Sequence, residues 1–328
     1  MKKFHRSFNL ESTVMQNFGK TLGMLSFILL ALFTGSSQAQ QPRFLSLAPP
    51  EGLPIVPIME GWVANPDGTR SFSFGYLNRN EDAVEIPLGE ANFMDPAEFD
   101  LMQPTHFSPG RHTGVFSVTV PADNIALEVW WNLKTDDQDI LNVPGRADRA
   151  GYELDFILPR PEGALQPLAG FGESSDISAG LSASVRDYSD SVIAESEVML
   201  IVRVKDNSVR DTSDSRYTEI LPIGVVFNKY QGPGAVTFTR HRDTVVVLRS
   251  EKAADPLCQG CRSGAKQDGP NAVSVPGPEG LARIYVSFSE PGNYIIHAKV
   301  DNFSSSDSSN TNQCCWTNVF QRVTVTPR

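Results

Sequence analysis

The residues with the most distinctive chemistry in this sequence are its four cysteines, which occur as two close pairs. Cys258 and Cys261 form a CxxC motif, whereas Cys314 and Cys315 are adjacent. Thiols at these spacings can form disulfides, bind zinc or copper(I), or carry out thiol–disulfide exchange. The compartment of the protein, and the elements that position the two pairs, decide among these three chemistries.

The first 39 residues have the order of a secretory signal peptide. Basic residues precede an uncharged apolar run over residues 22–33, and a small, polar stretch follows that ends at Ala39. We therefore expect residues 1–39 to be cleaved, so that the mature chain begins at Gln40 in a periplasmic or extracellular compartment. An uncleaved anchor is the competing interpretation, but the run is shorter than the ~20 apolar residues of a spanning helix.

Composition restricts the partners of the mature protein. The 328-residue chain has a net charge of −10, and residues 1–39 contain four basic residues and one acidic residue, so the mature charge would be −13. Nucleic acid requires clustered basic residues, so an acidic chain argues against it. With 40% hydrophobic and 20% charged residues, the composition is that of a globular protein with room for two domains.

Strict alternation of apolar and polar residues recurs along the mature chain and predicts β-strands. No helical period is sustained over three turns, and no later segment is long and apolar enough to span a membrane. One apolar face per strand is typical of antiparallel sheets stacked as sandwiches. The alternating stretches are 71–76, 127–134, 152–156, 198–204, 284–288, 294–300 and 319–325.

Turn motifs separate these strands. Asn65-Pro66-Asp67-Gly68 lies between two strand-like stretches, and its Asp-Gly step supplies the positive φ angles of a tight hairpin. Pro-Gly turns at 232–234 and 290–293 precede two further strands. We therefore predict an all-β protein of two tandem antiparallel β-sandwich domains.

One segment between the strands shows no alternation and is predicted to be a linker. It is rich in proline and glycine and covers residues 159–176. The mature chain then divides into an N-terminal β-sandwich domain, 43–158, and a C-terminal domain, 177–328.

Motifs in both halves resemble a group of exported bacterial proteins of uncharacterised function. In the first half they are 61–69 and 72–80, and in the second 229–234, 288–294 and 313–318. The second half is also similar to Ig-like and PKD-like modules, in which a Pro-Gly turn leads into a strand beginning with tyrosine and the module ends on a Val-Thr-Val strand. The resemblance implies the sandwich fold and supplies no activity.

The strand pattern also bears on the cysteines. If 282–288 and 294–300 are consecutive antiparallel strands, the loops that contain the two cysteine pairs lie at the same end of the C-terminal domain. An even number of cysteines in an oxidising compartment favours disulfides, and adjacent cysteines rarely bridge each other, so we expect cross-loop pairing. A metal-binding or thiol-redox role remains the alternative, whereas c-type haem is excluded because Arg262 replaces the required histidine.

Two tryptophans are candidate ligand contacts. Trp130 lies on the polar face of its predicted strand beside the core-facing Trp131, and it could stack on a sugar or a protein partner. Partial cover by the neighbouring domain would also explain its position. Trp316 is expected to pack against the disulfides at the cysteine end of the C-terminal domain, which is the other predicted interaction surface.

Catalytic and metal-binding patterns are weak. There is no G-x-S-x-G motif, and His106 and His112 flank a turn without an evident third metal ligand, while His297 is expected on the polar face of its strand. The acidic loops 136–139 and 206–214 lack the EF-hand pattern. We therefore interpret them as solvated loops, with calcium binding as the alternative.

These observations together predict an exported, non-catalytic binding or structural module without a cofactor. Its expected partner is a protein or a cell-envelope polysaccharide. An enzyme with an unrecognised carboxylate site is a further alternative, because pairs of acidic residues cannot be identified without the fold.

Overall fold

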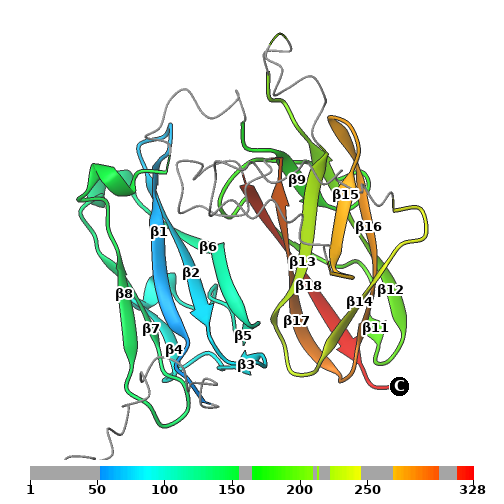
Figure 1. Cartoon of the computed structure of the whole chain (residues 1–328), viewed down its shortest axis with the longest axis horizontal. Coiled ribbons are helices and arrows are strands. Elements are labelled where there is room, and N and C mark those ends of the chain that lie inside the picture. Colours follow the sequence, from blue (N-terminus) through cyan, green and yellow to red (C-terminus); the bar gives the residue numbers. More distant parts are fainter. Residues whose placement is uncertain (1–51, 155–164, 210–212, 214–221, 245–268, 303–315) are drawn as a thin grey trace, which may run out of the picture. The chain divides into compact units, whose positions relative to one another are not determined.

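The computed structural model describes residues 52–154, 165–209, 213, 222–244, 269–302 and 316–328, and residues 49–328 form one compact unit. The regular elements of the described residues are strands and three short 3₁₀ helices, which confirms the predicted all-β fold (Figure 1). No helix in this part of the chain could cross a membrane.

Residues 52–154, which we call the N-terminal lobe, contain two three-stranded antiparallel sheets. Aromatic side chains fill the core, where the ring of Phe116 lies 5.2 Å from that of Phe74 and 5.0 Å from that of Trp131. The first sheet has the order β1 (Val56–Ala64), β2 (Arg70–Asn78), β6 (Gly110–Val120), the second β4 (Asn92–Asp95), β7 (Val129–Leu133), β8 (Leu141–Gly145), and a short pair joins β3 (Val84–Glu85) to β5 (His106–Phe107).

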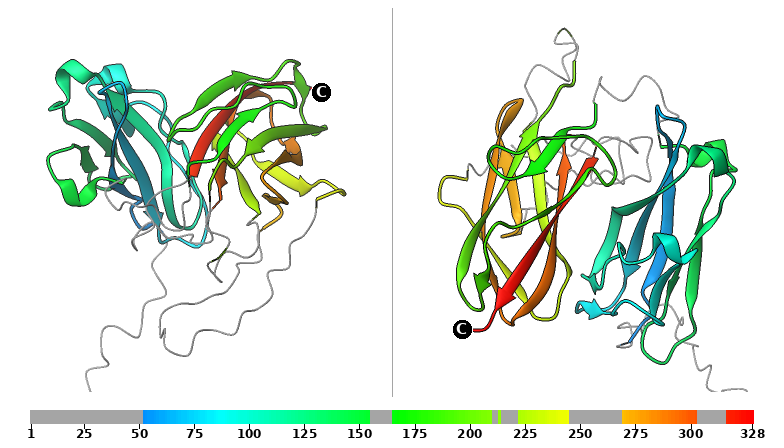
Figure 2. Two further views of the ribbon diagram at one scale, coloured as in Figure 1. Left: turned by 90° about the horizontal axis from the view of Figure 1, so that it is seen from above. Right: turned by 180° about the vertical axis from the view of Figure 1, so that it is seen from behind.

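The described residues from 165 onward, which we call the C-terminal lobe, form a sandwich of a six-stranded and a four-stranded sheet; Figure 2 shows both lobes from two further directions. The six-stranded sheet has the order β10 (Ser184–Asp187), β18 (Trp316–Thr326), β17 (Gly292–Asp301), β13 (Ile223–Gln231), β15 (Ala272–Val275), with β11 (Val192–Ile193) also paired to β18. The four-stranded sheet has the order β14 (Val236–Arg240), β16 (Glu279–Phe288), β12 (Glu197–Lys205), β9 (Leu168–Phe171).

Among the strands named above, pairing is antiparallel except where β10 and β11 run parallel to β18. Both parallel strands are short, so their alternation could not be recognised in the sequence. The strands predicted at 198–204, 284–288 and 294–300 are confirmed as parts of β12, β16 and β17, because each turns a continuous apolar row into the sandwich core.

The turn at Asn65–Gly68 connects β1 to β2 as predicted. The amide of Gly68, which has a φ of +87°, donates to the carbonyl of Asn65 at 3.0 Å. The hydroxyl and amide of Thr69 donate to Asp67, and these hydrogen bonds lower the pKa of that exposed carboxyl group.

Two of the predicted element boundaries are wrong. Leu168–Phe171, within the expected linker 159–176, form strand β9 and pair with β12; four residues with two small side chains are too few to show alternation. The other is the strand expected at 152–156, of which the structure describes residues 152–154. Tyr152 is the last residue of the 3₁₀ helix η3 (Ala150–Tyr152), and the amide of Leu154 donates to the carbonyl of Trp62.

The two lobes contact each other through polar groups of β17 and β18. His297, predicted on the polar face of its strand, is only 3% exposed, because β17 and β18 pack against Thr113 and Gly114 of β6. Lys299 Nζ donates to the Thr113 carbonyl at 2.6 Å, and Asn318 Nδ2 donates to the Gly114 carbonyl at 2.9 Å. The polar side of β17 is therefore an inter-lobe surface and not a solvated one.

Candidate functional site

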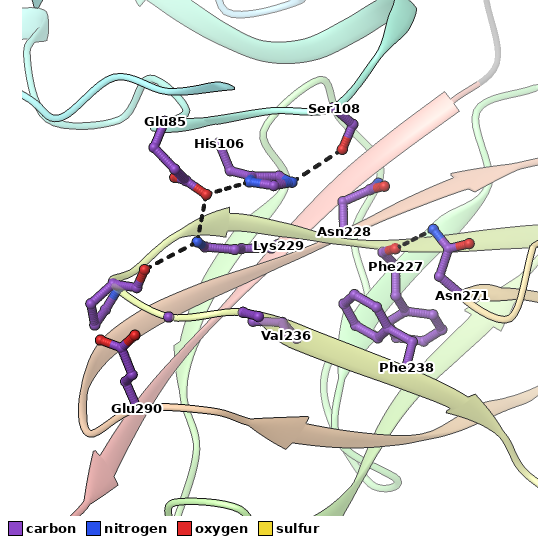
Figure 3. Close-up of a pocket in the computed structure, with 13 residues that line it drawn as sticks. Glu85, His106, Ser108, Phe227, Asn228, Lys229, Val236, Phe238, Asn271 and Glu290 are labelled. Carbon is purple, nitrogen blue, oxygen red and sulfur yellow. Dashed lines mark hydrogen bonds and ion pairs between the residues drawn. The ribbon is translucent and has the colours of Figure 1, made fainter. Parts of the chain in front are cut away.

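A pocket of about 450 Å³ lies where residues of β3 and β5 meet β13, β14 and the turn between them (Figure 3). Its lining combines charged and amide side chains with the aromatic rings of Phe227 and Phe238. We call it the junction pocket, because its residues come from both lobes.

The junction pocket is organised around the carboxylate of Glu85. One carboxylate oxygen, Oε1, lies 2.6 Å from His106 Nδ1 and 2.7 Å from Lys229 Nζ. Burial alone would raise the pKa of Glu85, but the hydrogen bonds and charges of His106 and Lys229 outweigh it and lower that pKa. The side chain of Lys229 is 6% exposed and that of Glu85 is 46% exposed, so a carboxylate that water still reaches compensates the charge of a nearly buried lysine.

Ser108 extends this network, since its Oγ lies 3.2 Å from His106 Nε2. A Ser–His–Glu order is one that nucleophilic hydrolases use, together with backbone or side-chain donors that bind an oxyanion. The nearby N–H groups are already used: that of Ser108 donates to Tyr76 at 3.0 Å, that of Gly234 to Tyr294 at 2.9 Å and that of Ala235 to Ser289 at 2.8 Å. These three N–H groups are therefore not free to bind an oxyanion.

The sequence did not identify Glu85 or Lys229 as site residues. They are 144 positions apart, and neither belongs to a motif that would reveal their contact. Only the pairing of the lobes brings them together.

His106 and His112 do not meet as a metal-binding pair. His106 bonds to Glu85, whereas the ring of His112 stacks on Tyr76 at 4.7 Å and its Nε2 lies 3.1 Å from the carbonyl of Pro109. Within the described residues, no group of three potential metal ligands occurs. In the acidic loop that begins at 206, the carboxylate of Asp206 accepts hydrogen bonds from Ser208 N and Asn302 Nδ2, both at 2.8 Å.

Trp130 lies on the second sheet of the N-terminal lobe, where the predicted alternation is confirmed. Val129, Trp131 and Leu133 are buried at 1% exposure or less, while Trp130 and Asn132 on the opposite face are partly exposed. The face that carries Trp130, which we call the outer face, is formed by β4, β7 and β8.

Trp316, the other predicted ligand contact, is only 3% exposed. Lys299 Nζ lies 4.7 Å from the centre of its ring, and a Cβ atom on Gly114 would come within 2.4 Å of the indole. Trp316 therefore packs between the lobes and offers no open stacking surface. All four cysteines, Cys258, Cys261, Cys314 and Cys315, lie outside the described residues.

Comparisons with known proteins do not assign the chain to a family. No protein-family model and no curated protein matches it. Among solved structures, the D00-D0 domain of Intimin is similar with a TM-score of 0.22 and 11% identity, over 83% of this chain and 99% of that chain. The D0-D1 domain of Intimin is similar with a TM-score of 0.23 and 10% identity, over 82% of this chain and 97% of that chain. TM-scores this low support no functional argument.

Proposed function

We propose that this protein is an exported, non-catalytic binding module whose partner is a protein or a glycan. In this proposal residues 1–39 are the signal peptide, and the mature chain is a tandem of two β-sandwich domains. Their bounds are those expected from the sequence, 43–158 and 177–328, with strand β9 (Leu168–Phe171) added to the second domain because it pairs with β12. The junction pocket supports the proposal indirectly, because its backbone donors are engaged within their own lobes and its carboxylate binds Lys229 of the other lobe.

The observation that carries the proposal is the position of Trp130. Large aromatic side chains that remain on a protein surface mark interaction sites, because they bring a large apolar area and a polar N–H to a contact. The adjacent Trp131 is completely buried and donates its indole N–H to Asn92 Oδ1 at 3.0 Å. One tryptophan thus completes the core, while its neighbour Trp130 keeps part of its surface accessible on the outer face.

Binding of the mature chain, 40–328, to immobilised peptidoglycan, envelope polysaccharide and envelope protein fractions tests the proposal. We expect retention on one of these fractions and loss of retention in Trp130→Ala. Tyr152→Ala is the matched control, since Tyr152 is a 55% exposed aromatic residue in η3, outside the outer face. Absence of retention on every fraction, or equal retention of the Trp130→Ala protein, would contradict the proposal.

We further propose that the four cysteines form cross-loop disulfides that brace the C-terminal domain. An exported chain with an even number of cysteines supports this assignment. Thiol counting by mass spectrometry on native protein, with elemental analysis, should find neither free thiols nor a stoichiometric metal. Four reduced thiols with bound zinc or copper would instead establish the metal-binding alternative, and a bridge between Cys258 and Cys261 in the Cys314→Ser protein would exclude the cross-loop pairing.

A further inference from the structure

We infer that the outer face of β4, β7 and β8 binds a neutral, β-linked glycan by stacking a sugar ring on Trp130. The inference rests on the proposed binding function and narrows its partner to one chemical class. It follows from which side chains the strand register gathers around Trp130.

The register places two cross-strand rows side by side on the outer face. Trp130 lies between Asp95 on β4 and Pro144 on β8, while Asn132 lies between Phe93 and Asn142. Neighbouring strands are ~4.8 Å apart and residues two apart on one strand are separated by ~7 Å, so these six residues form a patch roughly 10 Å wide. A patch of this size suits one or two pyranose rings.

The patch combines apolar rings with polar side chains, and a sugar likewise presents apolar C–H groups and polar hydroxyl groups. The rings of Trp130, Phe93 and Pro144 offer flat apolar surface for the C–H groups of a pyranose. Around them, a carboxylate and two amides supply both hydrogen-bond acceptors and donors for hydroxyl groups. β-Linked glucose and N-acetylglucosamine units have their substituents in the ring plane, which leaves flat faces that can lie on an indole.

The polar groups of the patch are available to a ligand. Within the described residues, neither Asp95 nor Asn142 forms a side-chain hydrogen bond or ion pair, and both are exposed. Asn132 makes only a 3.3 Å contact from Nδ2 to the Trp130 carbonyl. A sugar hydroxyl could therefore bond to these side chains without breaking a strong intramolecular bond.

Charge at the edge of the patch favours a neutral glycan over an anionic one. The nearby Arg146 is paired with Glu128 at 3.7 Å and with Asp148 at 3.3 Å, so its charge is already compensated. Asp95 contributes a negative charge within the patch itself. Lys134 continues the side of β7 that carries Trp130 and Asn132, and the charge of Asp95 offsets it, so the face offers no net positive charge to a sulfated or uronic glycan.

Titration of the mature chain with chitotetraose, cellotetraose and laminaritetraose, followed by tryptophan fluorescence and calorimetry, tests the inference. We expect at least one oligosaccharide to bind, Trp130→Ala to weaken it about tenfold or more, and Trp130→Phe to retain most of the affinity because a flat ring remains. Asn142→Ala removes only a hydroxyl partner and should weaken binding by roughly threefold to tenfold. Tyr152→Ala should bind as the wild type does.

The outcomes separate this inference from the proposed function. If no oligosaccharide binds, or if one binds the Trp130→Ala protein equally well, the glycan assignment is wrong. Retention of an envelope protein through Trp130, without oligosaccharide binding, would overturn the glycan assignment and leave the binding module intact. If neither an oligosaccharide nor an envelope fraction binds through Trp130, both the glycan assignment and the proposed binding function are wrong. Thermal unfolding of each variant confirms that it is folded before titration.

Discussion

His297 is a buried histidine whose environment makes the folded protein sensitive to mild acid. Its ring is buried between the lobes, stacks on Phe320 at 5.1 Å and bonds through Nε2 to Asn318 Oδ1 at 2.9 Å. Burial is the main cause that lowers the pKa of His297 to about 4; the charges of Lys299 and His112 act in the same direction, and the hydrogen bond to Asn318 opposes them. The folded protein therefore holds a neutral imidazole at pH values where the unfolded chain is already protonated.

Linkage gives the sign of the pH effect. Between a folded pKa of about 4 and an unfolded pKa near 6.5, the unfolded state binds more protons, so stability falls as the pH drops through this window. Between pH 7.5 and pH 5.5 we expect His297 to account for a loss of roughly 1 kcal/mol in the free energy of unfolding. Urea unfolding at both pH values should show a smaller loss for His297→Gln than for the wild type. An equal loss in the two proteins would show that His297 does not carry the effect.

At the scale of the elements, β6 and β18 approach each other closely at Gly114 and Trp316. Gly114 has a φ of +56°, and a Cβ atom there would lie 2.4 Å from the indole ring. The position therefore requires glycine for two reasons, since a side chain would strain the backbone and would displace a buried tryptophan.

A matched pair of substitutions separates these two reasons. Gly68, in the β1–β2 turn, also has a positive φ, but a Cβ atom there would meet only Ala122, at 3.3 Å. Gly68→Ala should cost about 1 kcal/mol from backbone strain, and Gly114→Ala about 2–4 kcal/mol from strain and overpacking. Thermal unfolding measures both values. Equal costs would mean that Trp316 moves freely away from β6.

Strand alternation predicted those elements that have one buried and one open face. In β7, Val129, Trp131 and Leu133 alternate with partly exposed residues, so period-two reasoning identified both the strand and the position of Trp130. The same reasoning predicted the strand at 71–76, which is part of β2, but it did not anticipate that Ser71 and Ser73 on the second face are buried as well as the aromatic residues between them. Small polar side chains can be buried on the second face of a sheet, and the sequence contains no sign of this cover.

The junction pocket was beyond sequence reasoning for a related reason. Its ion network joins Glu85 to Lys229, and neither side chain has a local partner that would mark it as functional. His106 was identified only as a turn residue, because its contact with Glu85 depends on the pairing of β3 with β5. The local sequence pattern thus predicts the strands, whereas contacts between distant strands and between lobes can be identified only from the folded structure.

At the scale of the whole molecule, the contacts between the lobes predict that they unfold together. Tyr230 and Phe320 of the C-terminal lobe belong to the apolar cluster that fills the N-terminal lobe. The Tyr230 hydroxyl donates to the Met102 carbonyl, and the Thr105 amide donates to the Tyr230 carbonyl at 2.9 Å. A shared core with direct hydrogen bonds couples the two sandwiches more strongly than a flexible linker would.

This coupling can be weakened without disturbing either sandwich. Tyr230→Phe removes one hydroxyl, and Gln231→Ala removes the donor that reaches the carbonyls of Leu101 at 3.1 Å and Gln103 at 2.7 Å. At about 1 kcal/mol for each lost bond, the double variant should lose roughly 2–3 kcal/mol of coupling. Tryptophan fluorescence and circular dichroism should therefore give coincident urea transitions in the wild type and separated transitions in the double variant.

The control removes a hydrogen bond that lies within one lobe. Thr324 Oγ1 contacts Asn293 Oδ1 at 3.2 Å across β17 and β18, on an exposed surface of the C-terminal lobe. Asn293→Ala with Thr324→Ala should lower stability slightly while fluorescence and circular dichroism still report one transition. Separated transitions in the wild type would show that the lobes are independent, and the polar groups of β17 would then be an exposed surface in solution. Coincident transitions in the Tyr230→Phe, Gln231→Ala protein would assign the coupling to the apolar packing of Tyr230 and Phe320 alone.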